Sequence, residues 1–147
     1  MPGRFENLAA SNFDGVLDCT SDATPSYNCI AWAAGKTNQP WWPIAVVKGY
    51  HWPSGLPKDE ETVANFTRAF ETEGYEVCIS SQIEPGFEKV AIYADADRNP
   101  LHAARSLPKG VWSSKIGDEE DIEHSTLEAV AGKLYGYPVV FLRRLIP

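Results

Sequence analysis

Cys29 stands at the start of a short apolar run that Asn28 precedes and Gly35 ends. Asn is a preferred N-cap residue and Gly a frequent helix terminator, so residues 29–34 are predicted to form a short buried helix. A cysteine in the first helical turn has backbone N–H groups and the positive end of the helix dipole beside its sulfur, and both favour the thiolate. The same N–H groups, with the Asn28 side chain, could hold the oxyanion of a tetrahedral intermediate. The pattern indicates a thiol nucleophile; the alternative is a small buried apolar residue, as most free cysteines are.

His102 is the residue that could serve such a thiolate as a base. It lies near the start of the stretch 101–106, whose alternation predicts a β-strand, and its neighbours are small. His51, in a proline-rich loop, could contact a substrate or act as an alternative base, but a packed or solvent-facing histidine also explains it. His124 has acidic neighbours and is expected to play a structural role inside a helix.

Three tryptophans lie close together in a segment that is poor in regular structure. Prolines and glycines recur between residues 36 and 58, which excludes long helices or strands there. Aromatic side chains on a stiff loop could line a groove for a peptide or a sugar. They could equally complete the hydrophobic core, and the sequence leaves both interpretations open. The three residues are Trp41, Trp42 and Trp52.

Neither a metal site nor a cofactor is expected. The acidic run 118–121 offers oxygen ligands for a hard cation, yet acids at the start of a helix are explained by the helix dipole. Cys19, Cys29 and Cys78 are odd in number and include no C-x-x-C pair, which fits neither a disulfide framework nor a typical zinc site. Free thiols in a reducing compartment are the simplest interpretation.

The predicted elements place these residues in one domain of residues 1–147. Residues 1–27 form an arm without a clear element, helices are expected at 59–73 and 118–132, and a closing strand at 139–146. Four successive strands are predicted to form a meander at 75–79, 89–94, 101–106 and 111–115. This order indicates an α+β fold with N-terminal helices packed on an antiparallel sheet of about five strands.

Composition limits the possible partners. The chain has 147 residues, a net charge of −7 and a pI near 4.9. An acidic surface repels a phosphate backbone, so nucleic acid is not an expected partner. No stretch approaches the roughly 20 apolar residues of a membrane span, and no signal peptide is recognisable. A cytoplasmic protein without a membrane partner is therefore expected, with export by a non-classical route left open.

The motif around Cys29, Tyr-Asn-Cys-Ile-Ala-Trp-Ala, followed by a sheet with a histidine, resembles the papain-like superfamily of cysteine hydrolases. Its transglutaminase-like and NlpC-type branches also place Asp or Asn before a cysteine on a helix. The whole chain is similar to small bacterial proteins with a Y-N-C-x-A-W-A segment, a similarity that adds no activity. The resemblance implies a papain-like fold and a thiol protease or amidase.

Carried over to this sequence, the transglutaminase-like pattern makes Cys29 the nucleophile and His102 the base. The third residue would come from the next strand, because pairing about the turn at residues 109–110 brings residues 114–118 opposite His102. Asp118 is the preferred orienting residue, and Ser114 is the alternative. The implied substrate is an amide bond in a peptide, a protein or a peptidoglycan stem.

Lys89 departs from the NlpC-type pattern. The segment Lys-Val-Ala-Ile-Tyr at 89–93 resembles the NlpC-type strand that begins with the catalytic histidine, and a lysine occupies that place here. Either the site is arranged as in transglutaminases, or the base has been lost. The two resulting hypotheses are a thiol-dependent hydrolase or acyltransferase with Cys29, His102 and Asp118, and a catalytically inactive domain that binds or regulates a partner.

Overall fold

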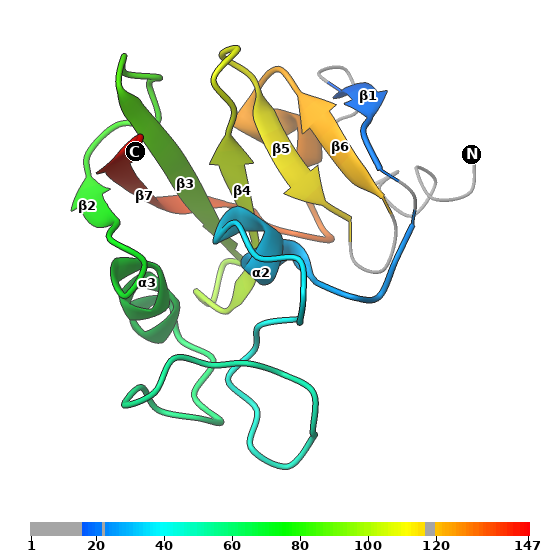
Figure 1. The fold of residues 1–147 in the computed structure, drawn as a ribbon, viewed down its shortest axis with the longest axis vertical. Helices are drawn as coiled ribbons and strands as arrows, with labels where there is room; N and C mark the ends of the chain where they lie inside the picture. Colours follow the sequence, from blue (N-terminus) through cyan, green and yellow to red (C-terminus); the bar gives the residue numbers. More distant parts are fainter. Residues whose placement is uncertain (1–15, 22, 117–119) are drawn as a thin grey trace.

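One antiparallel sheet runs through the part of the chain that the computed structural model describes, residues 16–21, 23–116 and 120–147 (Figure 1). Its seven strands follow the spatial order β1-β6-β5-β4-β3-β7-β2, and every neighbouring pair is antiparallel. The strands are β1 (Val16–Cys19), β2 (Glu76–Cys78), β3 (Phe87–Ala94), β4 (Pro100–Ser106), β5 (Trp112–Lys115), β6 (Asp121–His124) and β7 (Tyr137–Leu145).

The described helices are short. Helix α2 (Cys29–Ala33) begins as predicted, because the Asn28 side chain accepts a hydrogen bond from the backbone N–H of Ala31. Helix α3 (Val63–Glu71) is shorter than the predicted 59–73, and it starts where Thr62 caps the N–H of Asn65. A single 3₁₀ turn, η1 (Leu127–Val130), follows β6.

The expectation of a papain-like α+β fold is wrong. The described residues form mostly antiparallel sheet, with α-helices of only five and nine residues instead of a helical layer packed on about five strands. The local signals for single elements were largely correct. They did not predict the proportion of helix to sheet, because β1 and β6 lie in segments that the sequence pattern assigned to an arm and to a helix.

The prediction of a helix at 118–132 is wrong for the described residues, where β6 (Asp121–His124) is followed by the 3₁₀ turn η1. Residues 121–124 pair with β5 in the register Ser114↔Ile122 and Lys115↔Asp121. Ile122 and His124 point into the sheet's second core while residues 121 and 123 point to the other face, a period of two. Acidic residues before widely spaced apolar residues resembled a helix start, but the ladder with β5 decides the conformation.

The predicted meander is only partly correct. Strands β3, β4 and β5 pair in sequence, as expected. Strand β2 does not pair with β3, because the C-terminal strand β7 inserts between them (Figure 1). This insertion leaves β2 as the outermost strand on that side of the sheet.

Two hydrophobic clusters cover opposite faces of the sheet, since successive side chains of a strand alternate between faces. In β3, Val90 and Ile92 belong to the first cluster, and Ala91 and Tyr93 belong to the second. The first cluster also contains α2, α3 and two tryptophans, and the second contains η1 and the apolar residues of β5 and β6. Any pair of functional residues on β4 or β5 must therefore share a face to meet.

Candidate functional site

Cys29 begins α2, which packs over β4 and β5 (Figure 1). The residue is 8% exposed and belongs to the first cluster. Burial raises the pKa of the Cys29 thiol to about 11, and hydrogen bonding from the backbone N–H of Ala103 and Ile30 and the charge of Lys115 oppose this rise only in part. The helix start does not outweigh desolvation here, so Cys29 is a neutral thiol at neutral pH.

The His102 imidazole points to the opposite face of the sheet from Cys29. Its ring is stacked on Tyr135 at a centroid distance of 4.1 Å and lies 5.1 Å from the ring of Tyr93, both of which belong to the second cluster. The next residue, Ala103, belongs to the first cluster with Cys29. The structure therefore does not bring Cys29 and His102 together, and the predicted pairing of nucleophile and base has no geometric support.

His102 instead belongs to a buried chain of hydrogen bonds. Its Nε2 lies 2.9 Å from the Ser114 hydroxyl, which lies 2.8 Å from His124 Nε2. His124 Nδ1 must donate to the carbonyl of Thr126, at 2.7 Å, so its Nε2 accepts the Ser114 proton. Ser114 then accepts from His102 Nε2–H. Ser114, the alternative orienting residue of the sequence analysis, does contact His102. The contact lies on the face of the sheet opposite to Cys29, so it stabilises the fold and does not orient a base toward the thiol.

Burial favours the neutral form of both histidines. Burial lowers the pKa of His102 to about 3, and repulsion from His124 adds to the effect. Burial also lowers the pKa of His124, against the hydrogen bond to Thr126. His102 Nδ1 has no hydrogen-bond partner among the described residues, so a proton added there would find no acceptor.

Two charged residues that share the Cys29 face were not predicted to lie near it: Lys115 was not considered, and Asp121 was considered only as part of the acidic run 118–121. Lys115 and Asp121 are buried, pair in register between β5 and β6, and interact electrostatically. The Tyr27 hydroxyl donates to Asp121 Oδ2 at 2.8 Å. Burial raises the pKa of Asp121, and the bond from Tyr27 opposes it. Asp118, the predicted orienting residue, lies outside the described residues.

The remaining predicted site residues are structural. Asn28 accepts hydrogen bonds from the backbone N–H groups of Ala31 and Trp41, and its amide donates to the Trp41 carbonyl at 2.8 Å. It thereby joins α2 to the tryptophan-rich segment 36–58, here called the aromatic loop. Trp41 and Trp52 are buried in the first cluster, and Trp42 packs against it. All three tryptophans thus contribute to the core, and Trp41 also lines a second pocket, of about 310 Å³, together with His51.

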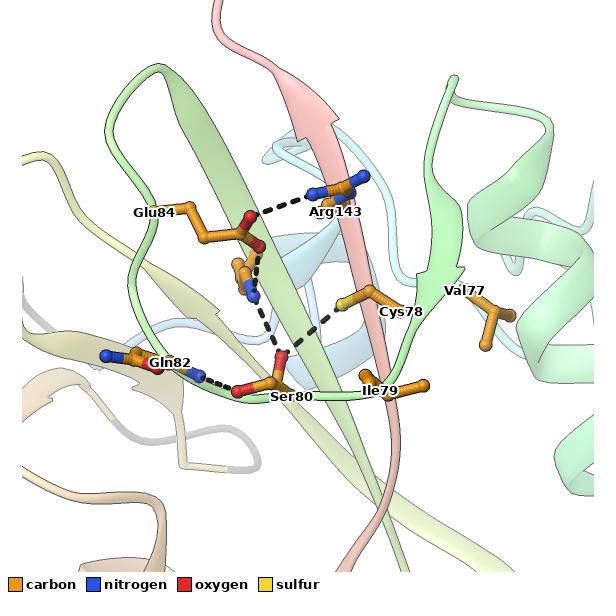
Figure 2. Close-up of a pocket in the computed structure, with 8 residues that line it drawn as sticks. Val77, Cys78, Ile79, Ser80, Gln82, Glu84 and Arg143 are labelled. Carbon is orange, nitrogen blue, oxygen red and sulfur yellow. Dashed lines mark hydrogen bonds and ion pairs between the residues drawn. The ribbon is translucent and has the colours of Figure 1, made fainter.

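A pocket of about 420 Å³ lies at the β2 edge of the sheet, away from Cys29. Strand β2, the irregular segment after it and side chains from β3 and β7 line it (Figure 2). Its lining residues are Val77, Cys78, Ile79, Ser80, Gln82, Glu84, Lys89 and Arg143.

One carboxylate and two cations form the polar side of this pocket. Lys89 is fully buried, and its Nζ lies 2.6 Å from Glu84 Oε2 and 2.8 Å from the Ser80 carbonyl. Arg143 Nη1 lies 2.8 Å from Glu84 Oε1, and Figure 2 shows these two side chains pointing toward each other. The hydrogen bond from Lys89, with the charges of both cations, lowers the pKa of Glu84.

Aliphatic side chains beside the pocket are exposed to solvent. Val77 on β2 is 54% exposed, and Ile79, just after the strand, is 100% exposed. Strand β2 pairs with β7 on one side, and no strand of the described residues pairs with its other side. The edge thus combines open backbone groups with apolar side chains, an arrangement that folded proteins usually avoid unless something binds there.

Sequence reasoning noticed Lys89 only as a substitute for a histidine. Its side chain lies on the face of β3 that also carries Ala91 and Tyr93, so it does not face Cys29. Arg143 and Glu84 were missed, because they are 59 residues apart and only the insertion of β7 brings them together. The one available signal was the apolar strand predicted at 139–146, which Arg143 interrupts.

A family model for a domain of unknown function, DUF7689, matches residues 18–143. The chain belongs to the DUF7689 family. No curated protein and no solved structure matches the chain. The DUF7689 match covers α2, the histidine chain and the β2 pocket, so all three belong to the family domain.

Within residues 16–21, 23–116 and 120–147, no three His, Cys, Asp or Glu side chains are grouped in a way that could hold a metal ion. None of the helices in these ranges is long and apolar enough to cross a bilayer.

Proposed function

We propose that this DUF7689 domain is a binding module that takes an extended peptide as an added strand along β2. The observation that carries the proposal is the outermost position of β2, where open backbone groups and the exposed side chains of Val77 and Ile79 lie beside a charged pocket. In strand addition, main-chain hydrogen bonds give affinity and pockets for alternate side chains give specificity. The β2 edge offers both.

The apolar part of this surface favours a partner. Val77 and Ile79 are two positions apart, so in extended chain they lie on the same face. Covering both would contribute about 1–3 kcal/mol, judged from the burial of aliphatic side chains. A strand of only three residues with a charged Glu76 is one way to protect an edge from pairing. A fully exposed isoleucine has the opposite effect and supports an interaction surface.

The thiol site supports binding over hydrolysis. Cys29 is buried as a neutral thiol, while His102 and His124 are joined through Ser114 on the opposite face. General base catalysis needs a basic atom within hydrogen-bond reach of the proton it removes, and these two imidazoles do not offer it.

The test is a binding titration with a fluorescein-labelled peptide of alternating valine and threonine residues, followed by fluorescence anisotropy. Val77→Asp should weaken binding by at least about tenfold, equivalent to about 1.4 kcal/mol, because it places a charge in the apolar contact. Val47→Asp is the matched control: Val47 is 46% exposed in the aromatic loop and lies outside the β2 pocket. No binding by the wild type, or equal effects of the two substitutions, would remove the proposal.

A further inference from the structure

We infer that the β2 pocket recognises a carboxylate of the bound peptide, and that Glu84 occupies this carboxylate site when no peptide is bound. The inference rests on the proposed function, because the peptide backbone would first align along β2. It names the chemistry that the pocket selects: an acidic side chain or the C-terminal carboxylate of the added strand.

The geometry shows a complete site for one carboxylate. Glu84 uses both of its oxygens, Oε1 toward Arg143 Nη1 at 2.8 Å and Oε2 toward Lys89 Nζ at 2.6 Å. Charge-assisted hydrogen bonds of this length are among the stronger polar contacts in proteins. A peptide carboxylate in the same position would replace both bonds, so recognition requires no rearrangement of the two cations.

The two cations are held in place by groups other than Glu84. Lys89 Nζ also donates to the Ser80 carbonyl, and its side chain is fully buried. The Arg143 guanidinium donates to Glu76 through Nε at 3.0 Å and lies 4.5 Å from the centre of the Phe87 ring. If Glu84 leaves, the site stays formed, and a buried lysine without a counter-ion favours the entry of another carboxylate.

Glu84 itself is the replaceable member. Its side chain is 35% exposed and belongs to the irregular segment between β2 and β3, so it can rotate into solvent without disturbing the sheet. Its backbone stays anchored, because the Glu84 carbonyl accepts from the Phe87 N–H at 3.1 Å. The exchange of one carboxylate for another conserves the number of ion pairs, and the strand contacts of the peptide then decide which one remains.

The acidic net charge of −7 does not prevent this recognition. At physiological ionic strength charges are screened over about 8 Å, so distant acidic residues act weakly on a ligand seated between Lys89 and Arg143. The immediate neighbours decide the preference, and raising the salt concentration should reduce the carboxylate preference rather than the apolar part of the binding.

The experiment compares three labelled valine–threonine peptides. The first has a free C-terminus and no acidic side chain, the second is amidated with one internal Glu, and the third is amidated with Gln at that position. With the wild type, at least one carboxylate peptide should bind about tenfold more tightly than the third. Which one does so identifies the terminal or the side-chain carboxylate as the source.

Two variants complete the design. Glu84→Gln, which removes the competing charge and keeps the size, should increase the carboxylate preference by at least about fivefold, and Arg143→Gln should abolish it while the third peptide still binds. Thermal melting confirms that each variant is folded. If all three peptides bind equally to the wild type and to E84Q, the carboxylate inference is overturned and strand addition stands. If no peptide binds, both fail together.

Discussion

Alkylation of Cys29 by iodoacetamide tests the thiol environment directly. An ordinary thiol with a pKa of about 8.5 is about 10% thiolate at pH 7.5, whereas the Cys29 thiol, with a pKa of about 11, is about 0.03% thiolate. This ratio of about 300 falls to about 20, because the more basic thiolate is the better nucleophile with a Brønsted slope of about 0.45. Cys29 should therefore react at least about 20-fold more slowly than free cysteine, and burial of the sulfur slows it further.

The dependence on pH is more discriminating than the rate itself. Between pH 7.5 and 9.5 the rate should rise about 100-fold for Cys29 but only about tenfold for an ordinary thiol, which is mostly ionised at the upper limit. The assay is timed alkylation of the native protein, followed by digestion and mass spectrometry of each cysteine peptide. All three cysteines are free, so the half-buried Cys19 and Cys78 serve as comparisons in the same sample.

Two results would refute the reasoning. One is a Cys29 rate at pH 7.5 that equals or exceeds the rate of free cysteine. The other is a rate that levels off below pH 9 while circular dichroism shows the protein still folded. Either result would mean that the helix start and the charge of Lys115 lower the Cys29 pKa more than burial raises it. A thiol enzyme with Cys29 as nucleophile would then be the better interpretation.

Three further outcomes are expected for stability. The pKa of His102 is lowered in the folded state, so the contribution of its neutral form to the free energy of unfolding is full above the unfolded pKa of about 6.5 and is lost as the pH falls toward about 3. Urea unfolding at pH 5 should therefore give a free energy of unfolding about 2 kcal/mol lower than at pH 8. The absence of that loss in the wild type would contradict the buried neutral histidine. Asn28→Ala should cost about 2–3 kcal/mol in the same assay, since it removes a helix cap and two bonds to the aromatic loop. Tyr93→Phe should cost about 1 kcal/mol, because it removes the buried hydrogen bond from the Tyr93 hydroxyl to the Leu127 carbonyl; no loss would mean that this bond adds nothing to stability.

Elements whose signals are local could be predicted from the sequence. Asn28 before an apolar run and Gly35 after it located α2, period-two alternation located β3, β4 and β5, and an apolar run located β7. In these segments the residue types and the tertiary environment favour the same conformation. The prediction was therefore accurate to within a few residues.

Strand partners could not be predicted, because they depend on contacts between residues far apart in the chain. Strand β7 pairs with both β3 and β2, and nothing in residues 139–146 indicates which neighbours they take. The same contacts form the β2 pocket, where Arg143 of β7 meets Glu84. The site that the structure favours thus arises from topology, whereas the site that the sequence favours arises from local motifs.

A single step of the strand alternation separates the hydrolase interpretation from the structure. Cys29 meets β4 at the backbone of Ala103, one residue from His102. Shifting β4 by one residue would turn the imidazole toward the sulfur, but it would break the His102–Ser114 bond at a cost of about 1–3 kcal/mol, and it would turn every other side chain of β4 to the opposite face as well. Such a cost is a large part of a typical domain stability of about 5–15 kcal/mol, so the observed register is strongly favoured. A strand histidine after a helix cysteine therefore does not by itself define a thiol enzyme, because the hydrogen-bond partners of the imidazole decide which face it occupies.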